Sequence, residues 1–141
     1  MAKLIKSIYT GVDVTALGEF TTSDSIEHDV VFAQDVTIQG VAVGDIVIDN
    51  DLSFNMVAGN NFKCTPTGTG TLTFTNITSG QSGNIWLDNT GGHTISAAAS
   101  TLIAAADLTT LSTAGVYFMS YYSDGTNVAV SVTPGVTSGG A

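Results

Sequence analysis

Apolar and polar residues alternate in short runs along the chain, and glycine-containing turns separate the runs. In the second half the alternating runs cover residues 71–74, 84–87, 94–96, 116–122 and 128–132. The turn dipeptides between them are Ser79-Gly80, Ser82-Gly83, Gly91-Gly92 and Asp124-Gly125. Alternation with period two is typical of half-buried β-strands, and such dipeptides are typical of turns. The pattern therefore predicts an all-β second half.

The first half contains shorter runs of the same kind. Residues 36–38 and 46–48 alternate between apolar and polar positions, and residues 40–44 read as the turn between two strands. Residues 51–64 offer two more short strands around Gly59-Asn60-Asn61. The first half is therefore also expected to consist of strands and turns.

Residues 96–110 are the segment with the most helical composition, because they contain two runs of three alanines. Alanine is the best helix former. Thr101, Thr109 and Thr110 interrupt the segment, which lies between predicted strands. We therefore expect a loop there with a single helical turn.

The segment from Thr65 to Gly70 contains proline and glycine and no apolar residue. Such composition marks a loop or a short hinge. It predicts a division into an N-terminal β region at residues 1–65 and a sandwich-like β region at residues 70–134. The glycine- and serine-containing end, residues 135–141, is expected to be a flexible tail.

The composition is unusually poor in charge. Charged residues make up 11% of the 141 residues and hydrophobic residues 43%, whereas an ordinary soluble domain carries roughly 25% charged residues. The net charge is −9, with Lys3, Lys6 and Lys63 as the only basic side chains apart from two histidines. A low content of charged residues favours association over a soluble monomeric state. The lack of clustered Lys and Arg argues against binding to nucleic acid.

No apolar run approaches the roughly 18 residues of a membrane span, and the N-terminus lacks the apolar core of a secretory signal. We therefore expect no membrane partner. Cys64 is the only cysteine, so an intrachain disulfide is impossible. Its strand-like surroundings predict a small buried hydrophobe rather than a reactive thiol.

No cluster of residues suited to catalysis stands out. His28 and His93 are the only histidines, and neither lies in a nucleophile motif. The acidic stretch from Asp24 to Asp29 could contact a basic partner, stay solvated or hold a cation, but strand alternation does not bring its side chains together. Asp45, Asp49 and Asp51 lack the pattern of a calcium loop. We therefore expect no enzyme, no cofactor and no metal site.

The aromatic residues of the predicted strand at 116–122 fall on both of its faces. Alternation places Tyr117 and Tyr121 on one face and Phe118 and Tyr122 on the other. One face would serve the core, and the second would be either a subunit interface or covered within the same chain. A carbohydrate platform built from Trp86 and tyrosines is a further interpretation.

The strand and turn signature of the second half resembles a known group of proteins. It reads LTFTNI at 72–77, GQSGNIWL at 80–87, GGHTI at 91–95, LTT at 108–110, GVYFMSYY at 115–122 and DGTN at 124–127. This signature resembles the small β-domains of tailed-bacteriophage fibres and capsid-decorating proteins. The resemblance implies an antiparallel β-sandwich or jelly roll that assembles as a trimer on the virion.

The chain is short and has no long repetitive stalk, which favours a head decoration protein over a tail fibre. We therefore expect a structural virion protein on the outer surface of the capsid, which cements the shell by bridging major capsid protein subunits. Its expected partners are the major capsid protein and two further copies of itself. The alternative is a receptor- or glycan-binding fibre domain. The expected interface residues are Leu4, Ile5, Ile8, Tyr9, Asp24, Glu27, Asp29, Trp86, Tyr117 and Tyr121.

Overall fold

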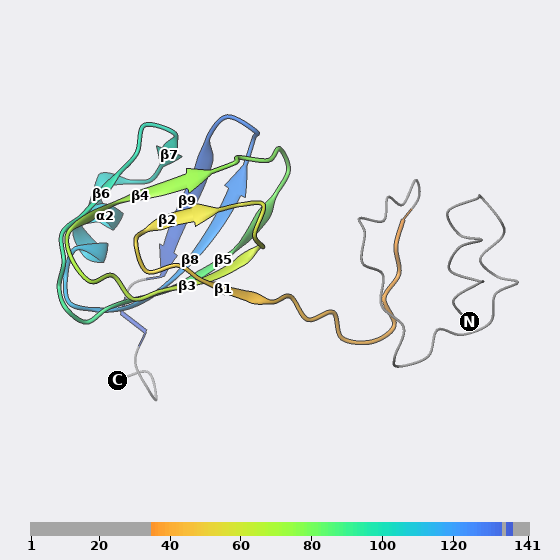
Figure 1. The fold of residues 1–141 in the computed structure, drawn as a ribbon, viewed down its shortest axis with the longest axis horizontal. Helices are drawn as coiled ribbons and strands as arrows, with labels where there is room; N and C mark the ends of the chain where they lie inside the picture. The colour runs from red at the N-terminus through yellow and green to blue at the C-terminus, as the bar shows by residue number, and fades with distance from the viewer. Residues whose placement is uncertain (1–34, 134, 137–141) are drawn as a thin grey trace, which may run out of the picture. The chain divides into compact units, whose positions relative to one another are not determined.

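The computed structural model describes residues 35–133, 135 and 136. The chain divides into two compact units between Val41 and Ala42. All strands and the helix of the described residues belong to the second unit (Figure 1). The seven predicted interface residues between Leu4 and Asp29 lie outside the described residues.

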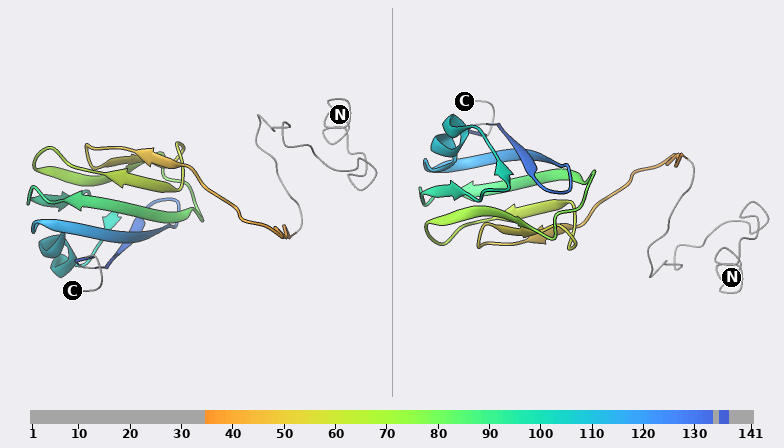
Figure 2. Two further views of the ribbon diagram at one scale, coloured as in Figure 1. Left: turned by 90° about the horizontal axis from the view of Figure 1, so that it is seen from below. Right: turned by 90° about the horizontal axis from the view of Figure 1, so that it is seen from above.

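Nine strands and one helix make up the described fold. They are β1 (Ile46–Ile48), β2 (Ser53–Asn55), β3 (Asn61–Cys64), β4 (Gly70–Thr75), β5 (Ser82–Asn89), β6 (Ile95–Ala97), β7 (Thr101–Leu102), α2 (Ala105–Leu111), β8 (Gly115–Ser123) and β9 (Val128–Thr133). A six-stranded sheet has the order β1-β3-β5-β8-β9-β7, and a three-stranded sheet has the order β2-β4-β6. The left view of Figure 2 shows the succession from β1 to β8 across the larger sheet.

The first six strands alternate between the two sheets, so that the chain winds like a solenoid. The strands β1 to β4 each pair in parallel with the strand two places later in the chain, as in β1 with β3 and β2 with β4. Only the pairs of β5 with β8 and β8 with β9 are antiparallel. The all-β prediction is confirmed, but the sheets are mixed and do not form a clear antiparallel sandwich. The reason is that consecutive strands enter opposite sheets, which leaves no hairpin until β8.

Inward-pointing residues pair in register across the large sheet. A continuous row runs through Val47, Phe62, Ile85, Met119 and Val132, one from each of five neighbouring strands. Phe62, Ile85 and Met119 are almost fully buried. Cys64 is also buried, as predicted. Burial of such rows is the main stabilising contribution to the fold.

Four aromatic rings join the two sheets at the centre of the core. Phe54 and Phe74 come from the small sheet, and Phe62 and Tyr121 from the large one. The ring centroids of Phe54 and Phe62 lie 5.1 Å apart, and those of Phe74 and Tyr121 lie 5.3 Å apart, all in tilted arrangements. Tilted contacts at this separation are favourable beyond the area that they bury. The four rings therefore fix the spacing of the two layers.

The sequence predicted a turn at Ser82-Gly83, but this prediction is wrong. The two residues form the beginning of β5. The backbone carbonyl of Asn60 accepts hydrogen bonds from the Asn84 N–H at 3.1 Å and from the Tyr121 hydroxyl at 2.8 Å. A Cβ atom on Gly83 would lie 1.7 Å from this carbonyl oxygen. Glycine is therefore needed here for close backbone approach inside a strand rather than for a turn.

The other predicted turn dipeptides are turns, whereas the turn predicted at residues 40–44 does not connect two strands. Gly80, Gly92 and Gly125 each have a positive φ angle, which glycine adopts without a steric penalty. The predicted strand at 46–48 is β1, whereas residues 36–38 form no strand. Residues 65–69, predicted as a linker, connect β3 with β4, and strands from both sides of this loop share each sheet.

The helix α2 is longer than the single turn expected. Thr109 and Thr110 donate hydroxyl hydrogen bonds to the carbonyls four residues earlier, at 3.1 and 3.0 Å. Their hydroxyl groups are thereby satisfied inside the helix. Leu111 is fully buried, and Leu108 packs against the core. Tertiary burial of these leucines favours the helix more than the isolated sequence indicates.

The helix and the residue after it protect the edge of β6, next to which α2 lies in Figure 1. The Ser112 hydroxyl accepts a hydrogen bond from the Ile95 N–H at 2.9 Å. The buried Asn89 carboxamide donates to the carbonyls of His93 at 2.8 Å and Leu111 at 2.7 Å. These side chains form hydrogen bonds with backbone N–H and C=O groups that have no partner in a neighbouring strand. They thereby close this end of the small sheet.

Substitution of Gly83 tests the close approach at Asn60. Gly83→Ala should lower the free energy of unfolding by about 3 kcal/mol or more, because backbone atoms obstruct the new methyl group. Gly68→Ala is the matched control, since no atom lies within 4 Å of its Cβ position. It should change stability by less than about 0.5 kcal/mol. Chemical denaturation of both variants measures the difference, and equal stabilities would contradict the packing described.

Candidate functional site

The outer face of the large sheet carries most of the exposed apolar side chains of the second unit. Two rows cross the sheet on this face. One row runs Ile48, Lys63, Trp86, Phe118 and Thr133, and the other runs Ile46, Asn61, Asn84, Ser120 and Ser131. The face therefore combines aliphatic, aromatic and amide groups on rigid strands.

The aromatic part of this face lies at its centre. Trp86 on β5 is directly opposite Phe118 on β8. The Trp86 side chain is 45% exposed and that of Phe118 is 36% exposed. Tyr122, near the end of β8, is also exposed. Phe118 and Trp86 thus form an aromatic pair that water still reaches.

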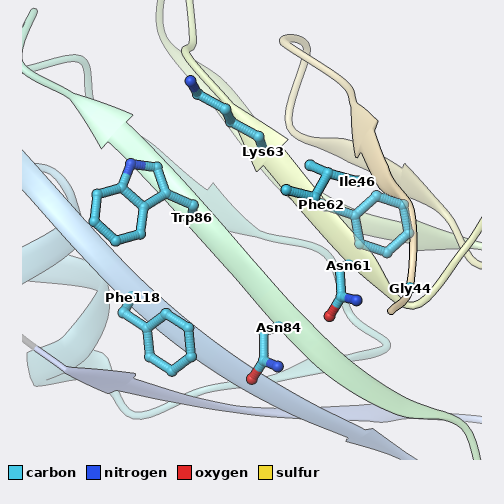
Figure 3. A pocket seen from close by; sticks show the side chains of 8 residues that line it. All are labelled: Gly44, Ile46, Asn61, Phe62, Lys63, Asn84, Trp86 and Phe118. Carbon is cyan, nitrogen blue, oxygen red and sulfur yellow. The ribbon is translucent and has the colours of Figure 1, made fainter. Parts of the chain in front are cut away.

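An open hollow of about 450 Å³ lies around this pair. Its lining includes the aromatic pair, the carboxamides of Asn61 and Asn84, and Lys63. In Figure 3 the two rings, the two carboxamides and the lysine all stand on the same face of the sheet. Ile46 and Gly44 border the hollow at the β1 side. The hollow is amphipathic, with an apolar floor next to a polar row.

The aliphatic part of the face lies at β1 and just before it. Ile46 and Ile48 are 66% and 70% exposed. Val43, which precedes β1, is more than four-fifths exposed. Among the described residues, β1 pairs with β3 alone. An edge strand with exposed aliphatic side chains is a ready surface for association.

The outer face of the small sheet is polar by contrast. Strand β4 contributes Thr71, Thr73 and Thr75, and Ser96 of β6 pairs with Thr71. The hydroxyls of Thr71 and Ser96 lie 2.9 Å apart and are hydrogen-bonded. The two outer faces of the solenoid therefore differ in chemistry, and only the large sheet presents an aromatic surface.

The predicted interface residues of the second half divide between the core and the surface. Trp86 is exposed as an interface residue requires. Tyr117 and Tyr121 lie in the core instead, where their hydroxyls donate to the carbonyls of Thr113 at 2.7 Å and Asn60 at 2.8 Å. Alternation separated the two faces of this strand correctly, but it did not indicate which face points inward. The outward aromatics of β8 are Phe118 and Tyr122.

Sequence reasoning did not identify Asn61 and Asn84 as site residues. Asn61 was interpreted as part of the turn Gly59-Asn60-Asn61, and Asn84 only as the first residue of the predicted strand at 84–87. The parallel register of β3 and β5 brings them to the same place on the outer face. Their position two residues before Lys63 and Trp86 was the available signal, because residues two apart share a strand face.

Asp49 and Asp51, two of the three aspartates considered for calcium binding, accept backbone hydrogen bonds within a turn. The Asp51 carboxylate accepts a hydrogen bond from the Ser53 N–H at 2.8 Å, and a hydrogen bond with Asp49 holds the pKa of Asp51 below its ordinary value. Partial burial raises the pKa of Asp49. Within residues 35–133, 135 and 136, no group of three or more His, Cys, Asp or Glu side chains could hold a metal ion.

The described part of the chain contains seven aspartates, and Lys63 is its only lysine or arginine. The helix of this part is too short to cross a membrane. No protein-family model, curated protein or solved structure matches the chain.

The reactivity of Cys64 tests its burial. Desolvation raises the pKa of the Cys64 thiol to about 11. At pH 8 the thiolate fraction in the folded protein should therefore be about one in a thousand, against about one in four for an unperturbed thiol. We expect Ellman's reagent to react with the folded protein at least about a hundredfold more slowly than with protein unfolded in guanidinium. Equal rates in the two states would show that the thiol is accessible.

Proposed function

We propose that this chain is a structural protein of a bacteriophage virion. It associates as a homotrimer, decorates the outer surface of the capsid and cements the shell by bridging major capsid protein subunits. It acts through binding and not through catalysis. The observation that carries this proposal is the exposed aliphatic surface formed by Val43, Ile46 and Ile48, at the edge strand β1 and just before it.

The energetics of this aliphatic surface favour assembly. Burial of one such side chain contributes about 2 kcal/mol, so the three of them contribute roughly 6 kcal/mol per chain. Bringing two proteins together costs about 4–15 kcal/mol in lost freedom of motion. The two figures are comparable, so a single contact of this kind is weak. Many copies on a repeating lattice, each touching several neighbours, make weak contacts collectively strong.

The charge of the body indicates the kind of shell surface that it fits. Seven aspartates against one lysine in the described residues give an acidic surface. Such a surface is attracted to basic patches of a protein partner and repelled by nucleic acid. A position on the outside of a shell keeps the protein away from the packaged genome. The predicted contact of the acidic stretch Asp24 to Asp29 with the shell follows the same logic.

The architecture is suited to a protein that must resist mechanical deformation of the shell. Parallel windings form a continuous hydrogen-bonded ladder from β1 to β5, and the antiparallel strands β8 and β9 extend the same sheet. The four-ring aromatic cluster connects this sheet with the smaller one. A body of this kind resists deformation, because close-packed interiors transmit strain.

A pair of charge insertions tests the proposal. The wild-type protein should have a mass near that of three chains by light scattering, and it should bind saturably to capsids stripped of accessory proteins. Ile48→Asp places a charge on the aliphatic surface, so it should yield monomers and weaken capsid binding about tenfold or more.

Val57→Asp is the matched control, because Val57 is 75% exposed in the loop between β2 and β3. This variant should keep both the trimer and capsid binding. Circular dichroism should show folded protein for both variants, since each changes an exposed side chain. A wild-type protein that is monomeric and does not bind stripped capsids would overturn the proposed function.

A further inference from the structure

The hollow on the outer face of the large sheet has the lining of a ligand site. Its volume of about 450 Å³ falls within the roughly 300–1,000 Å³ of small-molecule sites. Such sites combine an apolar floor with a few polar groups that orient the ligand. We propose that this hollow binds a neutral saccharide, a function beyond the proposed capsid role, with Ile46 at the border between the hollow and the aliphatic surface.

The floor of the hollow suits the apolar face of a sugar ring. Trp86 and Phe118 are in register on adjacent strands, so their side chains emerge about 5 Å apart. Both rings are partly exposed. A pyranose ring presents C–H groups on its faces, and stacking on two neighbouring aromatic rings removes these groups from water.

The polar row beside the floor suits the hydroxyl rim of the same sugar. Asn61 and Asn84 are in register on β3 and β5, two residues before Lys63 and Trp86. The polar row therefore lies about 7 Å from the aromatic row along the strands. Within the described residues neither asparagine makes a side-chain hydrogen bond. Each carboxamide offers both donors and an acceptor, which match vicinal hydroxyl groups.

This arrangement disfavours a purely apolar ligand. Such a ligand would bury the carboxamides of Asn61 and Asn84 and the Lys63 ammonium without hydrogen-bond partners. Each unpartnered buried group costs about 1–3 kcal/mol. A ligand with hydroxyl groups satisfies these side chains and still covers the rings. The combination of aromatic floor and amide row therefore selects an amphipathic, hydroxyl-rich molecule.

The local charge favours a neutral ligand. Lys63 lies directly opposite Trp86, and Asp88 is the next residue of β5 on the same face. These two charges balance each other around the aromatic pair. The remaining five aspartates among the described residues of the second unit repel anions at longer range. A neutral oligosaccharide meets no such barrier, whereas a polyuronate does.

Trp86 supplies a direct spectroscopic readout, because it is the only tryptophan of the chain. The full-length protein is titrated with cellohexaose, maltohexaose and chitohexaose, and its tryptophan fluorescence is recorded. We expect a saturable change in intensity or wavelength with at least one of these neutral hexasaccharides. Hexagalacturonate, which is acidic, should bind at least about tenfold more weakly.

Three variants locate the site. Asn84→Ala and Phe118→Ala should each weaken binding about tenfold or more, because they remove one part of the polar row and one part of the floor. Tyr122→Ala is the matched control, since Tyr122 is an exposed aromatic on the same strand face outside the hollow. It should leave binding unchanged. Should Phe118→Ala unfold, the exposed Asn84→Ala variant still decides the question.

Several outcomes would overturn the proposal. These are the absence of a fluorescence response to all three neutral hexasaccharides, equal weakening by Tyr122→Ala, and tighter binding of hexagalacturonate. The titration uses free protein without capsids, and Ile48→Asp should bind the saccharide like the wild type. Failure of the saccharide site and failure of the capsid role therefore give different results.

Discussion

The pairing register of β5 is the constraint on which the rest of the structure depends. This strand is parallel to β3 on one side and antiparallel to β8 on the other. Its register points Ile85 and Leu87 into the core and Trp86 out of it. A slip by one residue would reverse every side chain of the strand. Gly83 helps to prevent such a slip, because only glycine fits against the Asn60 carbonyl. Core and surface chemistry therefore follow from one alignment.

Both proposed binding surfaces lie on this aligned sheet rather than on loops. The aliphatic surface belongs to β1 and Val43 just before it, and the hollow lies over β3, β5 and β8. Ladder hydrogen bonds hold β3, β5 and β8 on both sides and β1 on one side, so the side chains of these strands keep their relative positions. Exposed aliphatic residues at an edge strand are a liability in a monomer. In a protein that functions in an assembly they are the part that drives assembly.

The sequence predicted the strands far better than their connections. Alternation located β4, β5, β8 and β9, and turn dipeptides marked the positive-φ glycines at 80, 92 and 125. Alternation has no information on which neighbour a strand chooses. The resemblance to phage β-domains implied an antiparallel sandwich, in which consecutive strands usually pair, whereas here the first six strands alternate between the two sheets. The length of α2 was missed for a similar reason, since burial of Leu111 is a tertiary effect.

By itself, the sequence determined the all-β class, the burial of Cys64 and the two-faced character of β8, because these follow from residue type and period-two alternation. It also determined the acidic charge that restricts the possible partners. Only the tertiary structure decided that Tyr117 and Tyr121 point inward while Phe118 points outward, and that Asn61, Asn84 and Trp86 share one face. The physical reason is that alternation defines two faces, whereas the choice between them depends on the opposite sheet, whose residues are distant in sequence.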